Sequence, residues 1–130
     1  MRYTLFFLLS GSVALFISGC DETAKTNKTL GILASTEFSV DLYRDDMGDY
    51  PRTELGWDAL IERPLDPAAA AKWKGPYLKR GKPIDAWGNP IKWELYDTTY
   101  QLRSCGPDGE FGNQDDVIAL AERADAKSLE

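Results

Sequence analysis

The chain has 130 residues, of which 43% are hydrophobic and 28% charged, a size and composition suited to one small domain. Its net charge of −6 opposes nucleic-acid binding, and no basic stripe with interleaved aromatic residues offsets that charge. The sequence contains no histidine, which excludes His-dependent triads, imidazole bases and His-ligated metals.

The N-terminal segment, residues 1–19, has the layout of a secretory signal peptide. Arg2 supplies a positive charge, residues 5–17 form an apolar run, and two small residues end the segment. The run is shorter than the roughly 20 apolar residues that a spanning helix needs. We therefore predict that residues 1–19 are a cleaved signal peptide, with a short membrane helix as the alternative.

The end of this segment resembles a lipobox, in which a cysteine thiol is acylated and the chain is cut just before it. Residues 17–20 read Ile-Ser-Gly-Cys, so we predict Cys20 as the lipidation site of a lipoprotein, with an ordinary signal peptide as the alternative. Two or three acyl chains on one residue give stable anchoring. Loss of Arg2 with the signal peptide would leave a mature net charge of −7. The alternative use of Cys20 is a disulfide with Cys105.

The residue after the lipid cysteine bears on location. Asp21 resembles an inner-membrane retention signal of bacteria that sort their lipoproteins. We therefore expect a protein anchored in the cell envelope by its lipid and facing the periplasm, with the inner membrane favoured.

Next along the chain, residues 20–28 are polar and predict a tether between membrane and domain. Thr29 is the expected cap of a helix that ends at residues 47–48, and Pro51 then requires extended backbone. The apolar positions of this helix fall at helical spacing, and we expect them to face inward: Leu30, Leu33, Ala34, Phe38 and Leu42.

Two shorter helical segments follow. Residues 54–62 predict a helix capped by Thr53, with Leu55, Leu60 and Ile61 facing inward. Residues 68–72 predict one further turn, after which glycine and proline mark loops.

The C-terminal half predicts strands. Apolar and polar residues alternate over residues 91–95 and again over 100–103, and residues 96–99 join the two as a hairpin. Residues 118–130 read either as a short strand with a tail or as a weak helix. The predicted domain covers residues 29–120 and the tail 121–130.

We expect the four tryptophans to fill a thin core or brace loops, rather than to form a carbohydrate-stacking platform.

The most informative segment is an acidic loop at residues 104–116, SCGPDGEFGNQDD. Four carboxylates in one glycine-rich loop repel each other unless a cation neutralises them, and flexible oxygen ligands suit calcium better than magnesium. The spacing does not match an EF-hand. The residues alone leave two interpretations, a calcium site and a solvated acidic turn.

Four segments in order resemble the major pseudopilins of type II secretion. Residues 41–53 resemble the helix exit of that family, and residues 73–78 and 85–90 resemble its two Trp-Gly-Pro-rich segments, with Ala86 where proline is usual. Residues 104–109, Ser-Cys-Gly-Pro-Asp-Gly, resemble its Ser-Leu-Gly-Ala-Asp-Gly calcium loop. Together these segments span most of the mature chain.

The resemblance implies an α+β fold in which an N-terminal helix packs on a small antiparallel sheet beside a calcium loop. It implies Ca²⁺ as cofactor, held by the carboxylates of Asp108, Asp115 and Asp116 and by the backbone carbonyl of Cys105, with the Asn113 carbonyl a weaker candidate. The expected function is a membrane-anchored, calcium-stabilised, structural or accessory protein related to type II secretion. Its expected partners are the membrane and secretion-system proteins, with no small-molecule substrate.

The N-terminus departs from the family pattern. Pseudopilins have a glycine before the cleavage site and a glutamate early in the helix, whereas this chain has Arg2 and Phe7 at those places. We infer that a lipid anchor replaces the polymerising helix. The alternatives are a divergent true pseudopilin cut near Tyr3, and an envelope binding module without a secretion role. We do not expect an enzyme, because no histidine activates Cys105, and the adjacent acids 115–116 are better explained as ligands.

Overall fold

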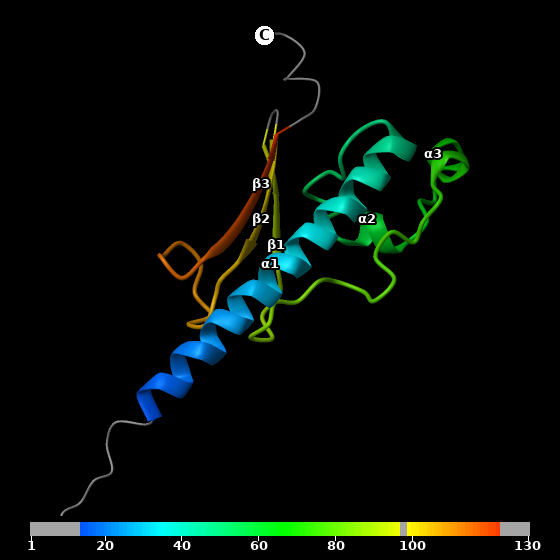
Figure 1. Cartoon of the computed structure of the whole chain (residues 1–130). Helices are drawn as coiled ribbons and strands as arrows, with labels where there is room; N and C mark the ends of the chain where they lie inside the picture. The colour runs from blue at the N-terminus through cyan, green and yellow to red at the C-terminus, as the bar shows by residue number, and fades with distance from the viewer. Residues whose placement is uncertain (1–13, 97–98, 123–130) are drawn as a thin grey trace, which may run out of the picture.

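A computed structural model describes residues 14–96 and 99–122, which form one long helix, two short helices and a three-stranded sheet. The long helix, α1 (Ala14–Met47), runs obliquely across the sheet, and the short helices α2 (Asp58–Ile61) and α3 (Pro67–Lys72) lie to its right in the view of Figure 1. Trp57, just before α2, meets Trp93 of the sheet edge-on. The predicted arrangement of an N-terminal helix on a small antiparallel sheet is confirmed.

The sheet is antiparallel in the order β1-β2-β3, formed by β1 (Lys92–Leu95), β2 (Thr99–Ser104) and β3 (Val117–Glu122). The N–H of Tyr96 donates to the Thr99 carbonyl at 2.7 Å and closes the first hairpin, whose residues 97–98 lie outside the described residues. The last segment is therefore a strand rather than a helix. It continues past the predicted domain end at residue 120, and residues 123–130 of the predicted tail lie outside the description.

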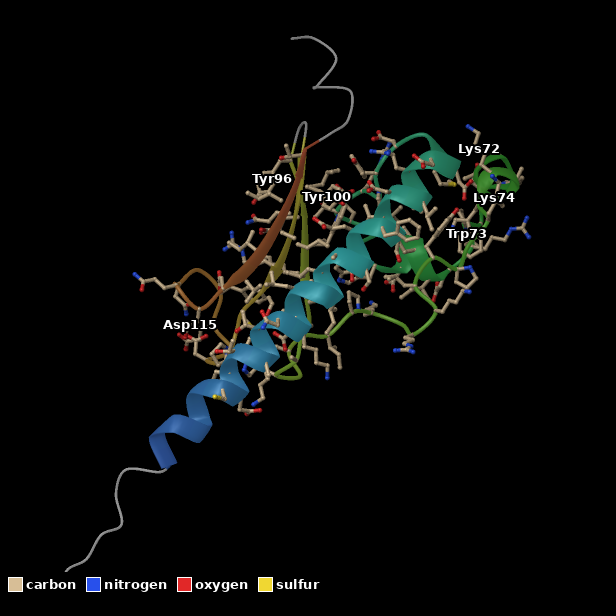
Figure 2. All side chains as sticks on the ribbon, viewed as in Figure 1. Lys72, Trp73, Lys74, Tyr96, Tyr100 and Asp115 are labelled. Carbon is tan, nitrogen blue, oxygen red and sulfur yellow. The ribbon has the colours of Figure 1, made fainter. Side chains whose placement is uncertain are left out.

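Large side chains of α1 and the sheet form the core. Tyr100 and Leu102 of β2 are fully buried, and the Trp93 ring of β1 stacks on Tyr100 with centroids 4.8 Å apart. Tyr50, just after α1, meets the Tyr100 ring edge-on at 4.9 Å. Figure 2 shows Tyr100 between the sheet and α1. Aromatic pairs in these arrangements add to the stabilisation from buried area, so β2 is the centre of this small core.

The buried face of α1 differs from the predicted one. Of the five residues expected to face inward only Leu33 is buried, and Leu30, Phe38 and Leu42 are 46%, 66% and 41% exposed. The face that meets the sheet recurs every three and four residues and includes two threonines: Thr29, Leu33, Thr36, Val40 and Tyr43.

Hydrogen bonds explain why two hydroxyls replace apolar side chains on that face. Thr36 donates its hydroxyl to the Ile32 carbonyl at 2.7 Å, and Thr29 accepts from the N–H of Ala86 at 3.1 Å. Burying a hydroxyl group costs little free energy when the group is hydrogen-bonded. Counting only apolar residues therefore selected the wrong face of α1.

The predicted tether is also wrong as a structural assignment. Residues 20–28 are helical, and α1 runs through them without a break, so Thr29 lies inside the helix rather than at its start. Local pairs support this polar turn of helix, including Lys25 with Asp21 at 3.0 Å. Such i,i+4 pairs stabilise helices even where no apolar face exists.

The second predicted helix is shorter than expected. Helix α2 covers four residues, because Gly56 has a φ of 53° and interrupts the helical backbone after Thr53. Leu55 is consequently 55% exposed, whereas Leu60 is fully buried as predicted.

The tryptophans brace the structure. Trp57 donates its indole N–H to the Ile91 carbonyl and Trp73 donates to the Ala59 carbonyl, at 3.0 and 3.1 Å. The Trp93 indole N–H is buried without a partner among the described residues. The Trp93 ring therefore contributes to the structure only by packing in the core.

Candidate functional site

The acidic loop connects β2 to β3 and turns beside the N-terminal half of α1 (Figure 1). Asp115 lies at the end of the molecule remote from Lys72 and Lys74 (Figure 2). Gly106, Gly109 and Gly112 all have positive φ values, of 66°, 76° and 98°. Glycine adopts this left-handed backbone without steric cost, so the glycines allow the loop its tight turns.

Side chains of the loop bind its own backbone. Asp108 accepts from the N–H of Glu110 at 2.9 Å and also from the Asn113 amide. The Asn113 side-chain oxygen accepts from the N–H of Asp115 at 2.9 Å. These are the short-range turns that Asp and Asn favour. Asp108 and Asp115 are both exposed at the loop surface.

Asp116 has a different environment, because its side chain is only 2% exposed. One carboxylate oxygen accepts from the N–H of Gly112 at 2.8 Å and from the Arg103 guanidinium at 3.3 Å. The other oxygen is buried without a hydrogen-bond partner in the described part of the chain. A buried carboxylate oxygen without a donor is costly and is a suitable ligand for a hard cation.

The predicted metal ligands lie within one loop, residues 105–116, but their side chains do not form a complete binding site. Within residues 14–96 and 99–122, no three acidic or cysteine side chains converge closely enough to hold a metal ion. The donor set still fits calcium in its chemistry, since it offers carboxylates, carbonyls and the unpartnered Asp116 oxygen. Asp116 would be the buried ligand, with Asp108 and Asp115 completing the site from the surface.

A turn at residues 85–89 is hydrogen-bonded to the start of the acidic loop. The buried Asp85 accepts from the Ser104 hydroxyl at 2.6 Å and from the N–H groups of Trp87 and Asn89 at 2.9 and 2.8 Å. The Asn89 amide donates to the Gly106 carbonyl at 3.1 Å. This turn therefore fixes the first residues of the acidic loop.

The same turn holds the N-terminal part of α1. Trp87 donates its indole N–H to the Glu22 carboxylate at 2.9 Å, and Ala86 donates to Thr29. Glu22 lies two residues after Cys20, whose free thiol is exposed on α1. The predicted lipidation site therefore lies at the surface, next to a helix segment that the domain holds in place.

Cys105 is buried and free, so the alternative disulfide with Cys20 is not formed in this structure. Burial, together with the negative charges of Asp85 and the loop, raises the pKa of the Cys105 thiol. A buried, protonated thiol is a poor nucleophile. Cys105 serves as a small, buried apolar residue at the start of the loop.

Sequence reasoning missed three residues of this site: Asp85, Asn89 and Arg103. The first two lie in a segment, residues 85–90, that was identified only by its family resemblance, and Arg103 is a polar residue of a strand that was predicted to be half-buried. An isolated aspartate beside Gly88 and Asn89 was the available signal, because such residues often bind nearby backbone N–H groups.

The chain matches the family model described as "Type II secretion system (T2SS), protein G" over residues 17–121. It is 36% identical over 117 residues to the type II secretion system core protein G of Escherichia coli K12, covering 85% of this chain and 77% of that protein. It is 33% identical over 114 residues to the protein of that name from Aeromonas hydrophila, covering 85% and 78%.

The fold also matches a solved structure, the crystal structure of the major pseudopilin from the type 2 secretion system of enterohaemorrhagic Escherichia coli. The TM-score is 0.65 at 27% sequence identity, covering 86% of this chain and 92% of the other. Both similarities include α1 and the sheet, so the whole described domain is related to these proteins and not its loop alone.

Proposed function

The chain belongs to the type II secretion system protein G family, and on that basis we propose that it is a structural component of the secretion machinery, held in the membrane by a lipid on Cys20 and stabilised by calcium. The major pseudopilin match supports a structural role in the cell envelope rather than an enzymatic one. The anchor and the calcium are separate parts of this proposal and need separate tests.

The lipid anchor is supported by sequence and position together. Cys20 follows a short apolar run and small residues, and its thiol is exposed on α1. Residues 1–13 of the predicted signal peptide lie outside the described residues, within which no helix is long and apolar enough to cross a membrane. We propose that the acylated chain faces the periplasm, with Asp21 favouring the inner membrane.

A fractionation experiment tests the anchor. Cells that express the full chain are grown with a radiolabelled fatty acid. The label should appear on the protein in the membrane fraction, and Cys20→Ala should remove it. Cys105→Ala is the matched control and should keep it. A wild-type chain without label in intact cells would refute the lipid anchor.

Calcium at the acidic loop rests on one observation above others, the buried Asp116 oxygen without a donor. Asp108 and Asp115 flank it within the same loop, and the carbonyl of Cys105 lies at its start. We propose that these groups hold Ca²⁺, and that the ion takes the place of the missing donor and orders the loop.

Thermal unfolding in calcium and in chelator tests this second part. If the dissociation constant is on the order of 0.1–1 mM, about 10 mM calcium would add about 1.4–2.7 kcal/mol of stability. The melting temperature should rise by several degrees, and magnesium should have a smaller effect. Asp108→Ala should abolish the rise. An equal rise in the variant, or none in the wild type, would refute the calcium site.

A second candidate function is a true pseudopilin that assembles into a fibre. The continuity of α1 from Ala14 through Cys20 favours it, because the predicted break between anchor and domain does not exist. In that case cleavage would occur near Tyr3 and Cys20 would keep its free thiol. The mass of the mature N-terminus distinguishes the two candidates.

A further inference from the structure

A groove on the opposite side of α1 from the acidic loop has no role in the function proposed above. It has a volume of about 690 Å³ and lies between one face of α1 and residues 77–85. Volumes of this order are typical of ligand sites in proteins. Ile32, Leu78 and Ile84 provide apolar lining, and Ile84 is 57% exposed.

The lining of the groove is positively charged, although the protein as a whole is acidic. Four cationic side chains line it: Lys28, Lys79, Arg80 and Lys82. Lys82 pairs with Asp58 at 2.9 Å, but the other three have no acidic partner among the described residues. Outside the groove, Lys25, Lys74 and Lys92 pair with acids, Lys74 with Asp46 at 2.6 Å, whereas Lys72 has no acidic partner in the described part of the chain.

The one acid of the groove does not offset these charges. Asp85 is 4% exposed, and its single charge is outnumbered by those of Lys28, Lys79 and Arg80. The groove therefore presents net positive charge to an incoming group, and the chemistry that complements it is anionic.

Hydroxyl groups along α1 narrow the choice of ligand. Ser35 and Thr36 donate to the Ile32 carbonyl at 2.9 and 2.7 Å, and Ser39 donates to the Ser35 carbonyl at 3.2 Å. Their protons are used within the helix, and Thr36 is itself buried, so the oxygens of Ser35 and Ser39 remain as acceptors for a donor on the ligand. A peptide carries N–H donors together with carboxylates, whereas an ionised fatty acid has no hydrogen-bond donor.

The length of the groove also suits a peptide. Lys28 and Ser39 are eleven residues apart on α1, which corresponds to about 16 Å at 1.5 Å per residue. An extended chain rises about 3.3 Å per residue, so a segment of about five residues would span the groove.

We propose that this groove is a docking site for an extended acidic segment of a partner protein, in which carboxylates alternate with apolar side chains. The carboxylates would pair with Lys28, Lys79 and Arg80, and the apolar side chains would cover Ile32 and Ile84. The ion pairs would set the register and specificity of the bound segment, and the covered apolar side chains would add to its affinity. It depends on neither Cys20 nor the acidic loop, so it can fail or hold independently of the function proposed above.

Fluorescence anisotropy with the purified full chain in detergent tests the proposal. The probe is labelled acetyl-Asp-Leu-Glu-Val-Asp-amide, and its twin carries Asn and Gln in place of the acids. The acidic probe should bind saturably, and the neutral twin about tenfold more weakly. Lys79→Gln with Arg80→Gln should also weaken binding about tenfold. The matched control, Arg52→Gln with Lys72→Gln, removes the same charge outside the groove and should change it by less than about twofold.

A second variant tests the apolar lining. Ile84→Asp should weaken binding about tenfold by placing a negative charge in the groove. Leu65→Asp, at a fully exposed position, is its control. Circular dichroism should show that all variants are folded, because the substituted side chains are exposed.

Three results would overturn the proposal. The first is no saturable binding, or binding that neither the Lys79/Arg80 pair nor Ile84→Asp weakens. The second is capture by phosphatidylglycerol vesicles, lost in the Lys79/Arg80 variant, without binding of the peptide, which would assign the groove to a lipid surface. The third is self-association by sedimentation, lost in the same variant, again without peptide binding, which would assign it to a second copy of the chain.

Discussion

The two ends of the domain are held together by different forces. At the aromatic core, Tyr100, Leu102 and Trp93 are buried among apolar neighbours. At the polar end, comprising residues 85–89 and 104–116, hydrogen bonds to Asp85 and Asp116 fix the backbone. The core is stabilised by area removed from water, which tolerates volume-conserving apolar substitutions but not the loss of side-chain volume. The polar end depends on individual atoms, so a single lost acceptor should loosen it.

The largest expected effect is at the core. Leu102→Ala removes a fully buried side chain of β2 and should lower the free energy of unfolding by about 2–5 kcal/mol. Chemical denaturation measures this loss. Leu120→Ala on the neighbouring strand is the control, because its side chain is 70% exposed and should cost less than about 0.5 kcal/mol. Equal losses in the two variants would contradict the assignment of the core.

The next effect is at the first glycine of the acidic loop. A Cβ on Gly106 would collide with the Asp115 carbonyl oxygen, and its φ is 66°. Gly112→Ala is matched to it, because its φ is 98° but nothing lies within 4 Å of the added carbon. We expect Gly106→Ala to cost about 1–3 kcal/mol more than Gly112→Ala. If denaturation gives the two variants the same stability, the close approach of the loop ends is wrong.

A loss no larger than the full cost of Gly106→Ala is expected from Asp85→Asn. The substitution keeps the size of the side chain but removes the charged acceptor of the Ser104 hydroxyl, which should cost about 1.5–3 kcal/mol. Hydrogen exchange should show faster opening at residues 87–89 and 106, with little change in β1. Asp66→Asn, an exposed helix cap on α3, is a control that should leave those residues unchanged.

The smallest effect is expected from Trp87→Phe. This change removes the indole N–H that donates to Glu22 and should cost about 0.5–1.5 kcal/mol. Hydrogen exchange should speed up in the part of α1 around Glu22, while the part around Val40 should keep its protection. Glu22→Gln retains a side-chain acceptor and should have a weaker effect. Uniform acceleration along α1 would contradict local docking.

The sequence predicted the core strands better than the polar end for a physical reason. Alternation of apolar and polar residues directly marks a half-buried strand, and it located Trp93, Tyr100 and Leu102 correctly. The same reasoning failed on α1, where hydrogen-bonded Thr29 and Thr36 replace apolar side chains on the buried face.

The polar end could be anticipated only in part. The density of acids indicated the loop between the last two strands, but the roles of Asp85 and Arg103 depend on contacts between residues far apart in the sequence. Local spacing carries no information on such contacts. The helical continuity of residues 20–28 was missed because a polar stretch shows no apolar period, although its charge pairs stabilise a helix.

The most direct test of the central claim, a lipid-anchored member of this secretion family, is the intact mass of the mature protein purified from its membrane, with sequencing of its N-terminal peptide. The account predicts a chain that begins at Cys20 and carries diacylglycerol, with or without a further acyl chain. A mature chain that begins near Tyr3 with a methylated N-terminus and an unmodified Cys20 would contradict the account and identify a true pseudopilin.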